Sequence, residues 1–153
     1  MEARVEFIVI GGFAATLLGT ARFTADLDVV YRRTEDNLAR LVAALAPFEP
    51  YLRGAPPGLP FRFDVATLRH GLNFTLSTTA GLLDLLGEAT GEGVFEKLLP
   101  DSEIEAVFGL EVRRVTLDRL IELKRAAGRV KDLEPIAELE ALREEKLRAS
   151  LGP

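Results

Sequence analysis

The sequence has 153 residues, the length of a single domain that can bury a hydrophobic core without disulfides. Apolar residues make up 48% of the chain and charged residues 28%, which excludes a disordered or fibrous protein, and the net charge of −5 excludes one that coats nucleic acid by bulk charge. Because the chain has no cysteine and one histidine, His70, disulfides and thiolate metal sites are excluded, so any metal is expected to be held by oxygen ligands, as magnesium, manganese and calcium are.

The first part of the chain alternates short strands and helices. Residues 5–10 are rich in β-branched side chains and stop at Gly11-Gly12, which predicts a buried strand. A short helix is expected over residues 13–18, and a second strand over residues 26–31. Residues 34–46 carry an amphipathic pattern that Thr34 can cap, so they are predicted to form a helix.

A proline-rich loop separates these elements from the remaining strands. Residues 47–60 hold five prolines and two glycines, which is long for a loop in a compact domain. Strands are expected over residues 72–77 and 82–86, followed by a polar loop over residues 88–93. A helical turn over residues 94–99 and strands near 104–108 and over 110–115 are predicted next.

The last third of the chain is predicted to be helical. Residues 116–127 and 131–149 form two amphipathic helices separated by a break at Gly128. Strands first and helices last indicate an α/β (α+β) fold with a mixed β-sheet flanked by helices. We therefore expect a single compact domain, in which residues 1–115 form the core and residues 116–153 form a helical segment packed on that core.

Two motifs near the N-terminus carry possible chemistry. Gly11 and Gly12 lie between a predicted strand and a predicted helix, where glycine lets a phosphate approach the backbone and the helix start supplies free N–H groups. Asp26 and Asp28 open a strand, where side chains two residues apart share one face and can share divalent cations. Each motif alone also fits an ordinary turn or two solvated acids, so the combination is the informative feature.

Together, the glycine pair, the short helix and the run Arg-x-Thr-x-Asp-x-Asp that ends at Asp28 resemble the DNA polymerase β-like nucleotidyltransferase superfamily. The run resembles most closely the small bacterial branch that includes AbiEii-type and MenT-type toxins. The resemblance covers roughly residues 5–142 and implies a nucleotidyltransferase fold with C-terminal helices. It also implies that Gly11 and Gly12 contact the nucleotide phosphates, and that Asp26 and Asp28 are catalytic and bind magnesium or manganese.

The same run contains two further candidate residues for nucleotide binding, Arg22 and Thr24. Arg22 could contact phosphate, or it could hold the aspartates in an ion pair when no metal is bound. The sequence leaves both readings open.

The family also uses a third carboxylate from a later strand. Asp84, within Gly81-Leu-Leu-Asp-Leu-Leu, fits this role as a catalytic and metal-binding residue. A lone carboxylate in such an apolar strand is costly unless a cation or a hydrogen-bond donor accompanies it. Asp64 is the rival candidate for the third carboxylate.

A basic segment near the C-terminus extends the resemblance. Residues 120–132 match the C-terminal motif of the branch, and Lys124 and Asp132 correspond to its lysine and aspartate. The segment holds four basic residues against two acids, which suits contact with a triphosphate or with RNA phosphates, although it also fits a solvated helix end. The resemblance implies a catalytic, nucleotide-binding Lys124 and nucleotide contacts from Arg125, Arg129 and Asp132.

These features together predict a metal-dependent nucleotidyltransferase. It would transfer a nucleoside monophosphate from a nucleoside triphosphate such as ATP to a hydroxyl of the tRNA 3′ end or of a protein, as the toxin of a toxin–antitoxin system with a cognate antitoxin. The alternative is a non-catalytic member of the same fold that binds a nucleotide or a partner. Because no apolar run reaches the ~20 residues of a membrane helix and the N-terminus does not resemble a signal peptide, a cytoplasmic protein without a membrane partner is expected.

Overall fold

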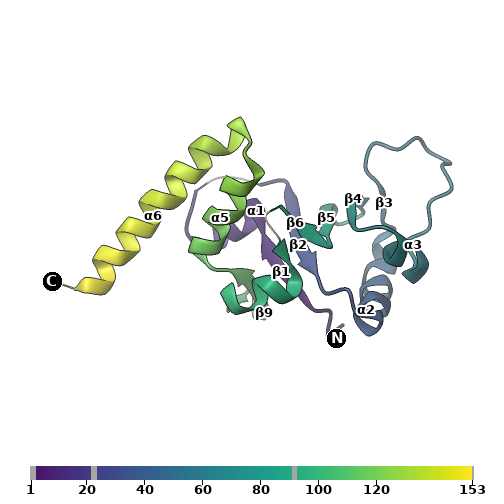
Figure 1. The fold of residues 1–153 in the computed structure, drawn as a ribbon. Coiled ribbons are helices and arrows are strands. Elements are labelled where there is room, and N and C mark those ends of the chain that lie inside the picture. The colour runs from purple at the N-terminus through teal and green to yellow at the C-terminus, as the bar shows by residue number, and fades with distance from the viewer. Residues whose placement is uncertain (1–2, 22–23, 91–92, 153) are drawn as a thin grey trace.

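The computed structural model of the chain describes residues 3–21, 24–90 and 93–152. Its centre is a seven-stranded mixed β-sheet (Figure 1). The strand order is β3-β4-β5-β2-β1-β9-β8. The bounds are β1 Phe7–Ile10, β2 Asp26–Tyr31, β3 Tyr51–Leu52, β4 Asn73–Thr78, β5 Gly81–Leu86, β8 Ser102–Val107 and β9 Leu110–Val115. A separate small hairpin consists of β6 Glu88–Ala89 and β7 Gly93–Val94.

The pairing of the central strands sets the position of the carboxylates. Strand β1 is antiparallel to β2 and parallel to β9, and β2 is parallel to β5. In this register Asp28 lies opposite Ile10 on one side and opposite Asp84 on the other. Strands β3 and β8 are the two edges, paired antiparallel to β4 and β9 respectively. The three predicted acidic positions therefore meet near the point where β1 ends.

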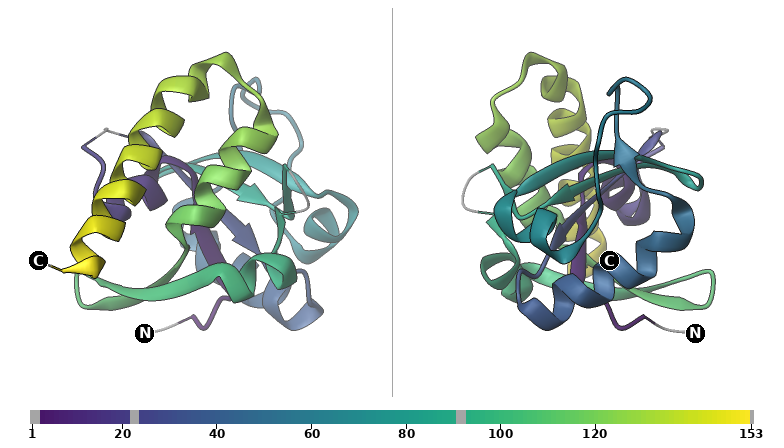
Figure 2. Two further views of the ribbon diagram at one scale, coloured as in Figure 1. Left: turned by 60° about the vertical axis from the view of Figure 1, so that its left-hand side comes forward. Right: turned by 90° about the vertical axis from the view of Figure 1, so that its right-hand side faces the viewer.

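In the described part of the chain, six α-helices flank the sheet (Figures 1 and 2). Their bounds are α1 Gly11–Leu18, α2 Glu35–Leu45, α3 Val65–His70, α4 Phe95–Leu98, α5 Leu117–Ala127 and α6 Leu133–Leu151. Thr34 caps α2, as the sequence predicts, and Thr116 caps α5 in the same way, each by accepting a hydrogen bond from a backbone N–H of the first turn. Within the described ranges, no helix combines the length and apolar character needed to cross a membrane.

The hydrophobic core lies between the central strands and the helices. Ile8, Val30 and Tyr31 of β1 and β2 are fully buried, as is Ile121 of α5. Helix α5 packs against α1 and against α6, and Figure 2 shows α5 and α6 side by side. This packing places one face of α5 over the end of β1, so that a polar residue on that face comes close to the carboxylates.

The predicted fold class, a mixed α/β sheet flanked by helices with helices at the C-terminus, is confirmed. The elements differ in detail from the sequence pattern. Helix α1 begins at Gly11, so both glycines lie inside its first turn. Helix α3 was not predicted, because six residues are too few for a periodic pattern, and Asp64 caps it by accepting a hydrogen bond from the Thr67 N–H at 2.8 Å. The proline-rich loop also contains β3 and the last two residues of a 3₁₀ turn, Ala46–Phe48.

Candidate functional site

Three carboxylates gather on one face of strands β2 and β5. Asp26 and Asp28 share that face because they are two residues apart on β2. Asp84 is the direct partner of Asp28 across the parallel β2–β5 pair. The Asp26 and Asp84 side chains are 38% and 24% exposed, so water screens their mutual repulsion only in part.

Asp28 is the least compensated of the three acids. Its Oδ1 is buried and has no hydrogen-bond partner among the described residues. Burial, followed by the hydrogen bond and charge of Asp84 and the charge of Asp26, raises the pKa of Asp28 to about 6, while the charge of Lys124 acts in the opposite direction. A carboxyl group in this position gains stability from an added cation or from protonation.

Arg53 supplies a positive charge to this cluster. It follows β3, and its guanidinium lies 3.0 Å from Asp84 Oδ1 and 3.4 Å from Asp26 Oδ2. The same group donates a hydrogen bond to the backbone oxygen of Leu76 at 3.1 Å. Sequence reasoning missed Arg53; the only signal available was that it is the one basic residue in the proline-rich loop. In the described part of the chain, Arg53 forms the ion pair with the aspartates that the sequence left open for Arg22. Arg22 itself lies outside the described residues.

Gly11 allows the start of α1 to approach Asp28. Its φ is +69°, in the region that favours glycine, and a Cβ at this position would overlap the Asp28 carboxylate. A Cβ at Gly12 would lie 2.9 Å from Thr24 Oγ1, which itself donates to the backbone oxygen of Asp26 at 3.0 Å. Among the described residues no side chain caps α1, so its first N–H groups are available to an anion.

Lys124 faces the carboxylates from helix α5. Its side chain is 12% exposed, and its Nζ lies 3.8 Å from Oδ1 of the buried Asp132. Arg129 Nε donates to the other oxygen of Asp132 at 2.6 Å. Burial lowers the pKa of Lys124, while the charges of Asp132 and Asp28 oppose that change. Asp132 therefore orients two basic side chains at this end of α5.

A pocket of about 340 Å³ joins these groups. Its polar lining includes Asp28, Asp84, Lys124 and Arg129, and the Gly11 backbone also contributes. Apolar side chains of β5 and α5 form another part of the wall, together with Asn73, Glu88 and Thr90. The acids, the bases and the free helix start of this pocket can accommodate a charged group. The apolar wall beside them can accommodate a flat, less polar group of the same ligand.

Not all predicted site residues line this pocket. Asp26 is connected to Asp84 through Arg53, while Gly12 and Thr24 pack against each other beside the pocket. Arg125 instead forms an ion pair with Glu140 of α6. The rival carboxylate, Asp64, is occupied as the cap of α3.

The donor set suits a hard divalent cation. Carboxylate oxygens are the ligands that magnesium and manganese prefer, and the unpartnered Oδ1 of Asp28 offers a free ligand atom. Within residues 3–21, 24–90 and 93–152, however, no three acidic or histidine side chains are arranged to hold a metal ion. Arg53 lies between Asp26 and Asp84 instead.

The fold resembles that of a solved protein. A crystal structure at 1.87 Å resolution from Thermotoga maritima, described as a "putative nucleotidyltransferase", matches with a TM-score of 0.54. The sequences are 14% identical, and the match covers 88% of this chain and 81% of that chain. Neither a protein-family model nor a curated protein sequence matches. At this identity the likeness shows a shared fold, in agreement with the predicted nucleotidyltransferase fold.

Proposed function

We propose that the chain is a metal-dependent nucleotidyltransferase of the AbiEii/MenT-like branch. The observation that carries the proposal is the alignment of Asp28 and Asp84 on neighbouring strands, beside the uncapped start of α1 and facing Lys124 across one pocket. Acids alone would fit many surfaces. Acids beside an anion-binding helix start and a buried lysine fit the transfer of a phosphorylated group.

In the proposed reaction a hydroxyl oxygen of the acceptor attacks the α-phosphorus of a nucleoside triphosphate. The bond from that phosphorus to the oxygen bridging to the β-phosphate breaks, and pyrophosphate leaves. Asp84 would accept the proton of the acceptor hydroxyl, while the α1 N-terminus at Gly11 and Gly12 and the Lys124 ammonium would bind the leaving phosphates.

Asp26, Asp28 and Asp84 are the residues that would hold the magnesium or manganese ions. When bound, such ions neutralise the charge that develops on the phosphoryl oxygens. Asp132 would act as a positioning residue, since it contacts both Lys124 and Arg129. Arg129 and Thr24 are proposed to assist nucleotide binding, and the same role is proposed for Arg22. Arg125 would first have to leave Glu140.

A transfer assay tests the proposal. Each of the four α-labelled nucleoside triphosphates is incubated with the protein, magnesium or manganese, and total tRNA, with a parallel reaction that lacks RNA. Label on tRNA would establish a tRNA nucleotidyltransferase and identify its base, and label on the protein would establish protein nucleotidylation. In either case Asp26→Ala with Asp28→Ala, and Asp84→Asn alone, should abolish the label, while Asp64→Asn should retain it.

The proposed toxin role has a separate test. Expression together with the neighbouring gene product should yield a stable complex and relieve growth inhibition. Growth that is unaffected by the active protein alone would contradict this part of the proposal while leaving the transferase activity intact.

One observation favours the alternative, a non-catalytic member of the fold that binds a nucleotide or a partner. Arg53, a residue of the same chain, forms ion pairs with two of the three acids, as a permanent structural arginine would without any metal. Manganese binding separates the two functions. Binding that is lost in the Asp26→Ala, Asp28→Ala variant supports the transferase, whereas the absence of both label and metal binding supports the non-catalytic protein.

A further inference from the structure

We infer that Arg53 holds the position of a divalent cation in the carboxylate cluster, and that its guanidinium withdraws from Asp26 and Asp84 before a cation binds. This inference rests on the proposed metal-dependent function. In this role Arg53 competes with the metal for the carboxylate oxygens and does not contact the substrate.

The contacts of Arg53 are those of a competing cation. One guanidinium contacts both Asp84, at 3.0 Å, and Asp26, at 3.4 Å, so it occupies oxygen atoms from two strands at once. Magnesium binds carboxylate oxygens at ~2.0–2.1 Å with strict octahedral geometry, which leaves no room for a guanidinium on the same atoms. Two cations on one pair of carboxylates would also repel each other.

The charge of the cluster is left unbalanced by this arrangement. Asp26, Asp28 and Asp84 carry three formal negative charges, and Arg53 makes ion pairs with only two of them. Asp28 keeps a buried oxygen without a hydrogen-bond partner in the described chain. A monovalent side chain thus compensates the cluster in part, whereas divalent cations would compensate it further.

The surroundings of Arg53 permit the side chain to leave without opening the sheet. Its backbone is anchored, because its N–H donates to the Thr75 oxygen at 3.0 Å beside the β3–β4 pair. Among the described residues its Nε is buried without a partner, and apart from the two carboxylates its side chain donates there only to the backbone oxygen of Leu76. The chain then passes Gly54, around which the structure is open, into a loop that projects from the sheet edge (Figures 1 and 2). Rotation about the side-chain bonds is therefore sufficient for withdrawal.

The test measures manganese binding directly. Titration calorimetry and manganese electron paramagnetic resonance are applied to the full chain in chelator-treated buffer, without nucleotide. The variants are Arg53→Gln, Arg53→Lys, the matched control Arg62→Gln, and Asp26→Ala with Asp28→Ala. Arg62 is an exposed arginine of the same connection, so its substitution removes an equal charge without touching the cluster. Circular dichroism verifies that each variant is folded.

We expect Arg53→Gln to bind manganese at least threefold more tightly than the wild type. Arg53→Lys should fall between them, because an ammonium cannot bridge two carboxylates as a guanidinium fork does, and Arg62→Gln should equal the wild type. Arg53→Gln should also melt at a lower temperature without metal and gain more from manganese than the wild type gains.

The outcomes separate this inference from the proposed function. If the wild type binds manganese through Asp26 and Asp28 but Arg53→Gln binds equally or more weakly, the inference is overturned and the proposed function stands. If neither the wild type nor Arg53→Gln binds manganese, the proposed metal-dependent function fails, and the inference fails with it. If Arg53→Gln and Arg62→Gln gain equally in manganese affinity, the gain comes from the lost positive charge alone, and the inference is also overturned.

Discussion

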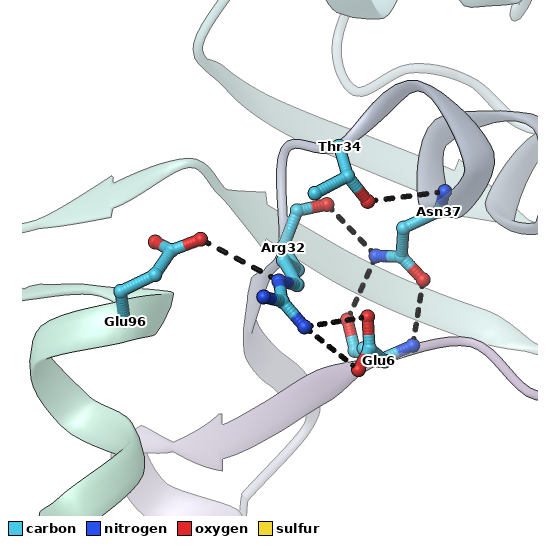
Figure 3. Close-up of polar contacts among 5 residues, drawn as sticks. All are labelled: Glu6, Arg32, Thr34, Asn37 and Glu96. Atoms are coloured by element: carbon cyan, nitrogen blue, oxygen red, sulfur yellow. Dashed lines mark hydrogen bonds and ion pairs between the residues drawn. The ribbon is translucent and has the colours of Figure 1, made fainter.

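The two ends of the β1–β2 pair carry polar clusters of opposite character. At one end, which Figure 3 shows, Asn37 of α2 joins the strands: its Oδ1 accepts from the Glu6 N–H at 2.7 Å, and its Nδ2 donates to the backbone oxygens of Glu6 and Arg32 at 2.9 and 2.8 Å. Arg32 in turn pairs with the Glu6 carboxylate at 3.0 Å and lies 3.6 Å from Glu96. The Asn37 amide is fully hydrogen-bonded at this end, and among the described atoms of the cluster Arg32 Nε alone is buried without a hydrogen-bond partner.

At the other end the charges do not match. Asp26, Asp28 and Asp84 face one arginine, Arg53, and a lysine that Asp132 already contacts. Evolved interiors pair their buried polar groups unless function requires otherwise, and shifted pKa values gather where it does. The comparison indicates that the Asn37 cluster stabilises the fold, and it supports the proposal that the carboxylate cluster binds a cation. Four experiments can break or sharpen this contrast.

The largest effect is expected on activity at the unmatched end. Asp28→Asn should lower the rate of nucleotidyl transfer by about 10³-fold, equivalent to about 4 kcal/mol, because a neutral amide is a poor ligand for a divalent cation. The melting temperature should not fall. Steady-state transfer with the labelled triphosphate measures the first quantity and calorimetry the second. Asp36→Asn, on the exposed start of α2, is the matched control; a loss below tenfold for Asp28→Asn would contradict the proposed site.

The second effect is expected on stability at the matched end. Asn37→Ala should lower the free energy of unfolding by about 3 kcal/mol, since it removes three hydrogen bonds and leaves the part-buried Glu6 N–H and Arg32 backbone oxygen without the Asn37 amide. Urea denaturation measures the change. Glu35→Gln on the same helix, which weakens an exposed ion pair with Arg69 of α3, should shift the midpoint much less. Equal shifts in the two variants would show that the Asn37 cluster has no special role.

The third effect compares two glycines that have a similar positive φ, at which any other residue would be strained. Gly11 and Gly54 both have positive φ, +69° and +78°, but only Gly11 has a neighbour where a Cβ would lie. Gly54→Ala should cost about 1 kcal/mol from the backbone alone, and Gly11→Ala about 2 kcal/mol, because it also displaces the Asp28 carboxylate. Thermal unfolding in the absence of metal measures both. A smaller cost at Gly11 than at Gly54 would mean that Asp28 does not depend on the close approach of α1.

The smallest effect concerns pH. The pKa of Asp28 is raised from 3.8 to about 6 in the folded, metal-free protein, so the folded state is penalised above pH 6, where the carboxylate is charged, and the penalty disappears as the pH falls toward 4. Asp28→Asn, which cannot titrate, should therefore be more stable than the wild type at pH 8. We expect a gain on the order of 1 kcal/mol, reduced by solvent screening.

That gain should shrink toward zero at pH 4.5. Because both proteins contain the same other titratable groups, the difference between their unfolding free energies isolates position 28. A gain that is constant between pH 4.5 and pH 8 would show that burial does not disfavour the Asp28 charge.

Local sequence patterns predicted the parts of the fold that depend on near neighbours. Strand β2 begins and ends at the predicted residues 26 and 31, and β9 at the predicted residues 110 and 115. Alternation, β-branching and the threonine cap at Thr34 each act over a few residues, so they can be recognised without tertiary information. For the same reason, the sequence pattern identified the glycines at the start of α1 and the acids of β2.

Contacts between residues far apart in the sequence could not be predicted from local patterns. Arg53 reaches Asp26 and Asp84 from 27 and 31 positions away, and Asn37 reaches Glu6 across 31. These distances depend on which strands are neighbours, and no local pattern contains the strand order. The pairing of Arg125 with Glu140 was hidden for the same reason. The cap at Asp64 is a local contact with Thr67, and it was missed because α3, with six residues, is too short for a periodic pattern.

The amino-acid sequence alone therefore determined the chemical inventory of this protein: oxygen ligands without cysteine, glycines before a helix, and two acids at alternate positions of a strand. Only the tertiary structure decided which groups meet, because strand order and register bring Asp84 beside Asp28, and helix packing brings Lys124 over both. It also decided that the guanidinium of Arg53, a residue from outside the sequence motif, lies between two of the carboxylates, since side-chain charges pair with whatever the folded backbone places within reach.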